Sequence, residues 1–160
     1  MGATVADSDP GRARDCLRES RELSTALGYQ SARDLVWAAS IAFLIDDQAA
    51  TLELGRRAIR GLQAGGERIR VGLALYIIAG ALVTTRPEAA AIIQGAAEAY
   101  VGDSATLVQP ISSTVTETLG DERAQDLRAR GADMSWDQTL AYALTQTTYA
   151  LSELKSDTEP

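Results

Sequence analysis

The chain has 160 residues, of which 46% are hydrophobic, and it carries 22 acidic against 15 basic side chains, a net charge of -7. A single domain of this size buries a stable core without disulfides or metals. Histidine is absent and Cys16 is the only cysteine. One chain therefore cannot build a Ser/His/Asp triad, a Cys/His dyad, a histidine-containing zinc site or a CxxC redox pair. The acidic excess opposes attraction to nucleic acid and to anionic lipid, so neither is an expected partner.

The residue types predict an all-α protein. Ala, Leu, Arg and Glu dominate the sequence, proline occurs only 4 times, and period-two alternation of β-branched residues is missing. The longest uncharged stretch, residues 71–85, is shorter than the roughly 20 residues that a membrane-spanning helix needs. Residues 1–14 lack the apolar core of a secretory signal. We therefore expect a cytoplasmic protein without a membrane segment.

Helices are predicted over residues 10–27, 31–45, 46–64, 67–84 and 87–101. Glycines after apolar stretches mark helix ends, and Ser31 with Asp34 has the spacing of a capping box. The first helix has a narrow apolar stripe that includes Cys16, so we predict a small hydrophobic side chain there rather than a reactive thiol. The helix over 67–84 carries two apolar stripes and should be the most buried.

An interval of 37 residues relates these helices. Gly28, Gly65 and Gly102 are separated by this interval, and the same shift places Ile41 over Ile78. An amphipathic helix followed by a nearly all-apolar helix therefore occurs at least twice, and such hairpins bury both faces only when they stack. We predict stacked antiparallel helical hairpins in a tetratricopeptide-like α-solenoid of about seven or eight helices, with a C-terminal capping helix. The alternative is a non-repetitive bundle with accidental glycine spacing.

One helical-repeat domain is predicted over residues 10–154, with hairpin repeats in 10–102 and a C-terminal cap in 103–154. Residues 1–9 and 155–160 are predicted to be disordered. The cap contains a threonine-rich helix up to Leu119, a charged helix over 121–130 and a last helix that starts with a capping box of Ser135 and Gln138. The last helix has an apolar stripe that should dock on the domain: Trp136, Leu140, Ala143, Leu144, Thr147, Leu151 and Leu154.

Two groups of side chains are candidates for binding a partner. Tyr142 and Tyr149 share one face of the last helix, away from its apolar stripe, and either pack on the preceding helix or form an exposed aromatic contact patch. Arg56, Arg57 and Arg60 form the charged face of the helix over 46–64. They could receive an acidic ligand or a partner carboxylate, but charged faces of amphipathic helices usually face solvent.

The hairpin repeat and the segment 119–144, which reads LGDERAQDLRARGADMSWDQTLAYAL, resemble the end of the tetratricopeptide-like helical region of large actinobacterial regulators. These regulators couple an ATPase module to helical repeats and often to a LuxR-type DNA-binding domain or a nucleotide-cyclase domain. The residues that carry the resemblance are Leu119, Gly120, Asp121, Glu122, Arg123, Leu127, Arg128, Gly131, Leu140, Ala143 and Leu144. The resemblance implies a region that binds partners or relays inducer signals. A GxxxxGKS/T loop and a basic helix-turn-helix are missing, so ATPase and DNA-binding activities are not expected here.

We predict a non-enzymatic scaffold without metal or cofactor that binds a protein segment or a second copy of the chain. The resemblance makes it a regulatory module or a remnant of a larger signalling or transcriptional regulator. The alternative is a sensor in which a cleft edged by Trp37, Tyr76 and the three arginines of the helix over 46–64 binds a small effector.

Overall fold

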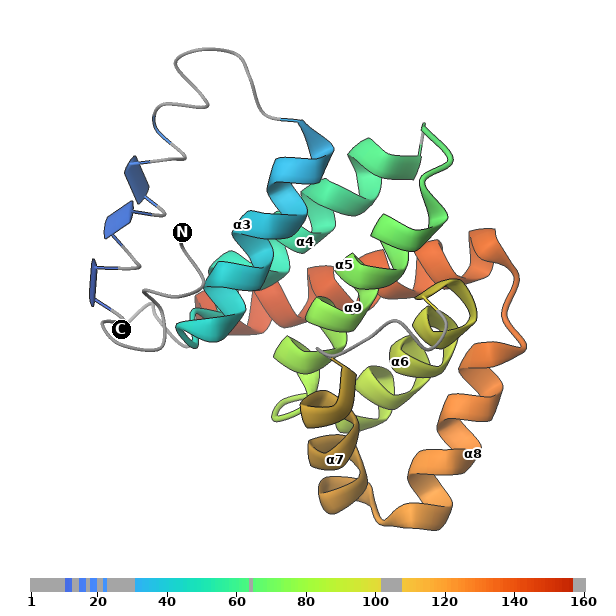
Figure 1. Ribbon diagram of the computed structural model, residues 1–160. Coiled ribbons are helices and arrows are strands. Elements are labelled where there is room, and N and C mark those ends of the chain that lie inside the picture. The colour runs from blue at the N-terminus through green and yellow to red at the C-terminus, as the bar shows by residue number, and fades with distance from the viewer. Residues whose placement is uncertain are drawn as a thin grey trace.

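The structure, a computed structural model, describes residues 11–12, 15–16, 18–19, 22, 31–63, 65–101 and 108–156. Within these ranges it contains seven complete helices and no strand, so the predicted all-α fold is confirmed (Figure 1). The helices are α3 (Ala32–Leu44), α4 (Gln48–Gln63), α5 (Arg68–Leu82), α6 (Pro87–Val101), α7 (Val108–Leu119), α8 (Asp121–Ala132) and α9 (Trp136–Ser156). The predicted helix over 10–27 and the segments 1–9 and 157–160 lie wholly or largely outside the described residues.

Two helices begin with the capping boxes that the sequence predicts. Ser31 Oγ accepts a hydrogen bond from the Asp34 amide at 3.2 Å, and the Asp34 carboxylate accepts one from the Ser31 amide at 3.3 Å. Ser135 and Gln138 form the same reciprocal pair before α9, at 3.3 and 2.8 Å. These bonds satisfy amides that have no partner within the helix, and so they fix where α3 and α9 begin.

The first four described helices pack as two hairpins. α3 lies on α4, and α5 lies on α6. α4 also packs against α5, and α3 contacts α5, which brings the two hairpins together. The equivalent helices α3 and α5 start at Ala32 and Arg68, close to the interval that separates the three glycines. This packing of consecutive helices is consistent with the predicted hairpin repeat.

The centre of the core is α5. Every residue from 74 to 82 is buried, and Leu75, Ile78 and Leu82 are buried completely. Five helices contact α5: α3, α4, α6, α7 and α9. The prediction that this is the most buried helix is confirmed, because two apolar stripes on one helix require neighbours on more than one side.

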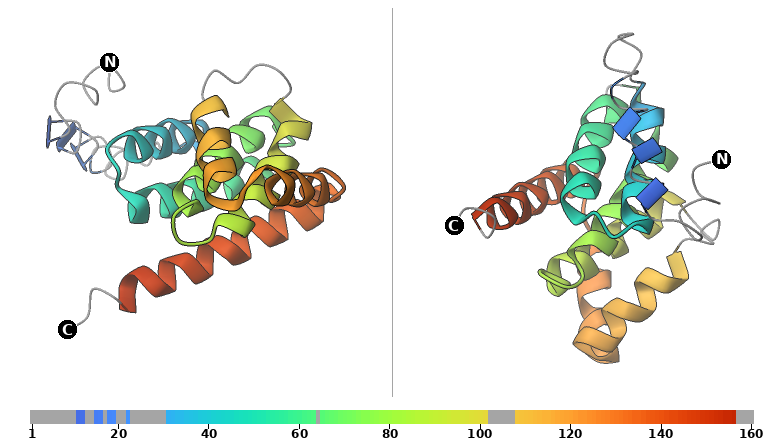
Figure 2. Two further views of the ribbon diagram at one scale, coloured as in Figure 1. Left: turned by 90° about the horizontal axis from the view of Figure 1, so that it is seen from below. Right: turned by 90° about the vertical axis from the view of Figure 1, so that its left-hand side faces the viewer.

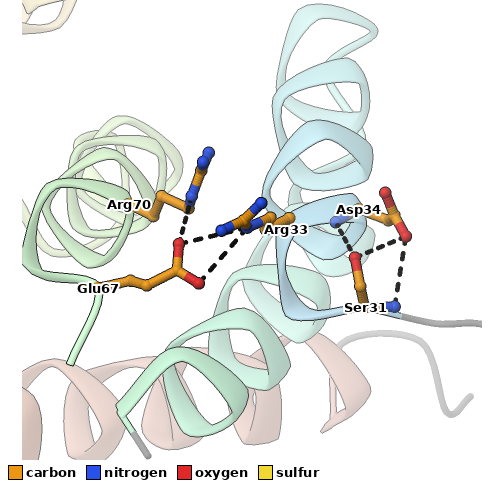
Figure 3. A network of polar contacts seen from close by, with 5 residues as sticks. All are labelled: Ser31, Arg33, Asp34, Glu67 and Arg70. Carbon is orange, nitrogen blue, oxygen red and sulfur yellow. Dashed lines mark hydrogen bonds and ion pairs between the residues drawn. The ribbon is translucent and has the colours of Figure 1, made fainter. Parts of the chain in front are cut away.

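A small ionic network ties α3 to α5 at their N-terminal ends (Figure 3). Glu67, in the turn before α5, accepts hydrogen bonds from Arg33 of α3 at 3.4 Å and from Arg70 of α5. Burial raises the pKa of Glu67, but the hydrogen bonds and charges of Arg70 and Arg33 outweigh it and hold this pKa below its ordinary value. The groups are partly exposed to solvent, so the network orients the helices more than it stabilises them.

α6 and α8 touch through their backbones at Gly95 and Gly131. A Cβ atom added to Gly95 would lie 2.0 Å from the carbonyl oxygen of Arg128, and one added to Gly131 would lie 1.9 Å from that of Ile92. Both distances are far inside van der Waals contact, so no other residue fits without moving a helix backbone. The crossing of α6 and α8 therefore depends on these two glycines.

α9 lies across the hairpins and does not simply extend a stack. It contacts α4, α5 and α6, and Figure 2 shows it running along one side of the other helices. Its buried residues form one stripe: Thr139, Leu140, Ala143, Thr147 and Ala150. This stripe is flanked by half-buried side chains that pack against the core: Trp136, Leu144, Leu151 and Leu154. The last helix docks, as the sequence predicts, and it continues to Ser156, past the predicted domain end at residue 154.

The α6–α8 crossing can be tested at Gly131. Gly131→Ala places a methyl group against a backbone carbonyl in the core, so it should lower the free energy of unfolding by roughly 3 kcal/mol, although alanine favours helices. Gly65→Ala is the matched control, because an added Cβ there has only ordinary contacts at 3.7 Å or more. Urea unfolding of both variants measures the difference. Equal midpoints for the two variants would contradict the close crossing.

Candidate functional site

A polar surface on α9 is built around Arg86, which lies in the turn between α5 and α6. The Arg86 guanidinium donates a hydrogen bond to the side-chain oxygen of Gln146 at 3.1 Å. It also donates to both carboxylate oxygens of Glu153, one of them at 3.1 Å. Pro87 follows directly and begins α6, where its fixed φ suits the first turn. Two side chains of α9 therefore hold this turn in place.

Tyr142 and Tyr149 both lie next to Arg86. The guanidinium carbon is 5.5 Å from the centre of the Tyr149 ring, within cation–π range, and Tyr149 is 54% exposed. Tyr142 is half-buried and lines a hollow of about 280 Å³ together with Arg86, Glu88 and Gln146. We call the following group the Arg86 surface: Arg86, Glu88, Tyr142, Gln146, Tyr149 and Glu153.

Two groups of the Arg86 surface, Arg86 and Tyr142, have raised pKa values. The hydrogen bond to Glu153 raises the pKa of Arg86, and the smaller effect of burial does not reverse this. Burial raises the pKa of Tyr142, which the charge of Arg130 opposes and that of Glu88 reinforces. Arg86 is therefore a permanent cation and Tyr142 a neutral hydrogen-bonding group.

The structure brings the two predicted tyrosines together, and the neighbour that they share is Arg86. Sequence analysis missed Arg86 because a turn residue before a proline carries no signal for contact with a helix some 60 residues later. Arg56 is half-buried and pairs with Glu53 of its own helix at 2.6 Å. Arg57 and Arg60 are exposed on α4. The three arginines belong to α4, whereas the Arg86 surface is built from α9, the turn before α6 and the first turn of α6.

Cys16 departs from its predicted environment. The sequence places it in the apolar stripe of the first helix, as a small hydrophobic side chain, whereas the structure leaves it exposed. The neighbouring described residues Asp15, Arg18 and Glu19 are exposed as well. The prediction that Cys16 is covered is therefore wrong for this structure.

A second group of polar side chains lies where α5, α6, α7 and α8 meet. Gln94 of α6 is fully buried and accepts a hydrogen bond from Arg128 Nε of α8 at 3.3 Å. Arg128 also donates to Thr116 Oγ1 of α7 at 2.5 Å. Tyr76 of α5 is 2% exposed and shares a hydrogen bond with Glu98 of α6. We call these five residues the buried polar cluster after its buried members Gln94 and Tyr76; Thr116 and Arg128 are half-buried, and Glu98 is exposed. The cluster links four helices through side chains.

The buried polar cluster corrects the predicted effector cleft. Tyr76 is inside the core, while Trp37 of α3 is 68% exposed, so Tyr76 does not edge an open cleft with Trp37. A hollow of about 530 Å³ lies instead beside the cluster, lined by Glu98, Asp121, Gln125, Arg128, Ala129 and Ala132. Gln94 is the one polar side chain between Ala89 and Ala97. That isolation in an apolar run was a signal for a buried hydrogen-bond partner.

Comparisons with protein-family models, with curated proteins and with solved structures find no match. The resemblance to the actinobacterial regulators therefore stays a prediction. Over the part of the chain that the structure describes, no three His, Cys, Asp or Glu side chains gather as metal ligands would. In the same ranges no helix combines the length and the apolar character needed to cross a membrane.

Tyr76 provides a test of the buried polar cluster. Burial, followed by the charge of Glu98 and its hydrogen bond, raises the pKa of Tyr76. Above the ordinary tyrosine pKa of about 10, the unfolded chain loses this proton while the folded chain keeps it, so the free energy of unfolding should fall as pH rises. Tyr76→Phe should reduce that fall, as measured by urea unfolding in mildly and strongly alkaline buffer. Tyr149→Phe, at an exposed site, is the control, and an equal fall in both variants would contradict the assignment.

Proposed function

We propose that the chain is a non-enzymatic helical scaffold that binds a protein segment or a second copy of itself through the Arg86 surface. The observation that carries this proposal is the exposed Tyr149 ring beside a guanidinium that α9 holds through Gln146 and Glu153. Tyrosine and arginine are among the residue types that contribute most binding energy at protein interfaces. Because hydrogen bonds already fix Arg86, little side-chain entropy is lost when a partner binds.

Hollows in the surface beside Tyr142 and Glu153 support the same proposal. Besides the hollow of about 280 Å³ beside Tyr142, a hollow of about 440 Å³ lies next to Glu153 and Leu154. Side chains of a partner would enter these hollows while its apolar or aromatic groups stack on Tyr149. Polar groups around the aromatic ring would then form hydrogen bonds at the edge of the contact.

The hairpin packing of α3 to α6 supports the tetratricopeptide-like part of the proposal. In repeat proteins of this kind, stacked hairpins present surfaces on which other proteins dock. The resemblance of residues 119–144 supports a regulatory module, or a remnant of a larger signalling or transcriptional regulator. Since α9 covers part of α4, α5 and α6, our proposal places the contact on α9 and the turn before α6.

A second candidate function is that of a small-effector sensor, and one observation favours it. Glu98 and Arg128 line the hollow of about 530 Å³ and also belong to the buried polar cluster, so a ligand there would act on four helices. Thermal unfolding with a panel of small polar metabolites separates the two functions. A sensor gains stability with one of the compounds, whereas a scaffold responds only to a protein.

The scaffold proposal is tested by Tyr142→Ser combined with Tyr149→Ser. Loss of both rings should weaken self-association or partner capture about 30-fold, the effect of losing roughly 2 kcal/mol at an interface hot spot. Sedimentation across a range of concentrations measures self-association, and affinity capture measures partner binding. Arg86→Lys should weaken binding as well, because lysine keeps the charge but loses the paired hydrogen bonds and the flat stacking group.

Thr148→Ala is the matched control, since Thr148 is exposed on α9 but lies outside the Arg86 surface. Helical circular dichroism and thermal melting must stay unchanged in the tyrosine variant. Unchanged association with an intact fold would move the binding site elsewhere. Unfolding would show that the tyrosines are structural. Turnover of a nucleotide or an ester by the purified protein would overturn the non-enzymatic proposal.

A further inference from the structure

The hollow of about 280 Å³ in the Arg86 surface collects hydrogen-bond donors. Arg86, Tyr142 and Gln146 line it, together with Glu88. Gln146 directs its side-chain oxygen to the Arg86 guanidinium, which leaves its amide N–H groups for another acceptor. Among the described residues, neither this amide nitrogen nor the Tyr142 hydroxyl has a hydrogen-bond partner. The bonds of Arg86 to Gln146 and Glu153 also leave N–H groups of the guanidinium unused within that part of the chain.

The carboxylates beside the hollow already have cationic partners. Glu153 binds Arg86, and Glu88 accepts two hydrogen bonds from Arg123 of α8, at 2.8 and 3.3 Å. Because each negative charge is close to a guanidinium, their repulsion of another anion is largely compensated. The hollow is therefore open to an acceptor that carries its own negative charge.

Arg130 of α8 adds a positive charge at the same place. Arg123 pairs with Glu88 and Asp126, whereas Arg130 is exposed and forms no ion pair within the described ranges. Burial raises the pKa of Tyr142, and the charge of Arg130 is the largest effect that opposes this rise. The field of Arg130 therefore reaches the Tyr142 side of the hollow. In a chain with a net charge of -7, this is a local site that favours an anion.

We propose that the hollow binds a carboxylate, the side chain of an aspartate or glutamate in the partner segment, an inference that rests on the scaffold function proposed above. A carboxylate accepts several hydrogen bonds at once, which matches the donors of Arg86, Tyr142 and Gln146. The volume of about 280 Å³ is below the roughly 300–1,000 Å³ of small-molecule pockets, so it suits one side chain. An apolar or aromatic residue beside the acidic one then stacks on the exposed Tyr149 ring.

Two capped peptides test this in the full chain: acetyl-Glu-Gly-Phe-amide and its uncharged counterpart acetyl-Gln-Gly-Phe-amide. Binding at millimolar peptide is measured from the shifts of the Gln146 side-chain amide in nuclear magnetic resonance spectra. The glutamate peptide should bind roughly tenfold more tightly, because its acceptor is charged. Equal affinities, or no shift with the glutamate peptide, would overturn the proposal. Acetate that binds as tightly as the peptide would also overturn it, by assigning the hollow to a free small carboxylate.

Two variants of the protein separate a carboxylate contact from general contact with the surface. Tyr142→Phe removes a hydroxyl donor but keeps the ring, and Arg130→Gln removes the charge beside it. Each should weaken binding of the glutamate peptide several-fold and affect the glutamine peptide much less. Arg60→Gln removes the same charge at an exposed position of α4 and should change neither affinity. Equal weakening of both peptides would contradict the carboxylate site.

The outcomes distinguish this inference from the scaffold function. If Tyr142→Ser with Tyr149→Ser weakens association, while Tyr142→Phe and Arg130→Gln change neither association nor peptide binding, the scaffold function holds and the carboxylate site is wrong. If the double serine variant leaves association unchanged, while the glutamate peptide binds preferentially at Gln146, the carboxylate site holds and association uses another surface.

Discussion

The backbone contact between α6 and α8 is the constraint on which the arrangement of the C-terminal half depends. α6 packs against α5, α7, α8 and α9, and its alanines and Gly95 let neighbouring helices approach closely. At Gly95 and Gly131 the approach leaves no space even for a methyl group. The short distance between the two backbones then lets Gln94 and Arg128 meet in a hydrogen bond at 3.3 Å. The close helix crossing and the buried polar cluster are thus one feature.

That cluster restricts how the helices can slide along one another. Gln94 is fully buried, and an unsatisfied amide there would cost about 1–3 kcal/mol, so any register that breaks its bond to Arg128 is disfavoured. Arg123 of α8 adds a second contact to α6 through Glu88 at 2.8 Å, near the other end of α6. Apolar packing of alanines alone would tolerate several registers, because alanine faces are nearly uniform. The polar contacts select one of them.

The spacing of apolar residues predicted most of the helices, because within each amphipathic stretch this spacing shows which face of the helix is buried. The capping pairs at Ser31 and Ser135 fixed two helix starts for the same local reason. A buried face does not say which helix will cover it, so the path of α9 across α4, α5 and α6 could not be derived from its stripe. The sequence around Gly131 predicts only the end of a helix. The structure shows that a glycine is needed there because the backbone of Ile92, a residue distant in the sequence, lies against it. The shared face of Tyr142 and Tyr149 followed from helix geometry, whereas their common neighbour Arg86 did not.

The position of α9 determines which helix surfaces stay exposed to solvent. In a stack of hairpins the two ends expose apolar faces that terminal elements must cover. α9 covers α4, α5 and α6 from the side, and α8 covers α6. Large apolar side chains stay exposed on α3, at Trp37 and Leu44, and at Ile69 in the first turn of α5. In the Arg86 surface, by contrast, Gln146 and Glu153 already bind the guanidinium, while the Tyr149 ring stays exposed. This combination suits reversible contact with another molecule rather than completion of the fold.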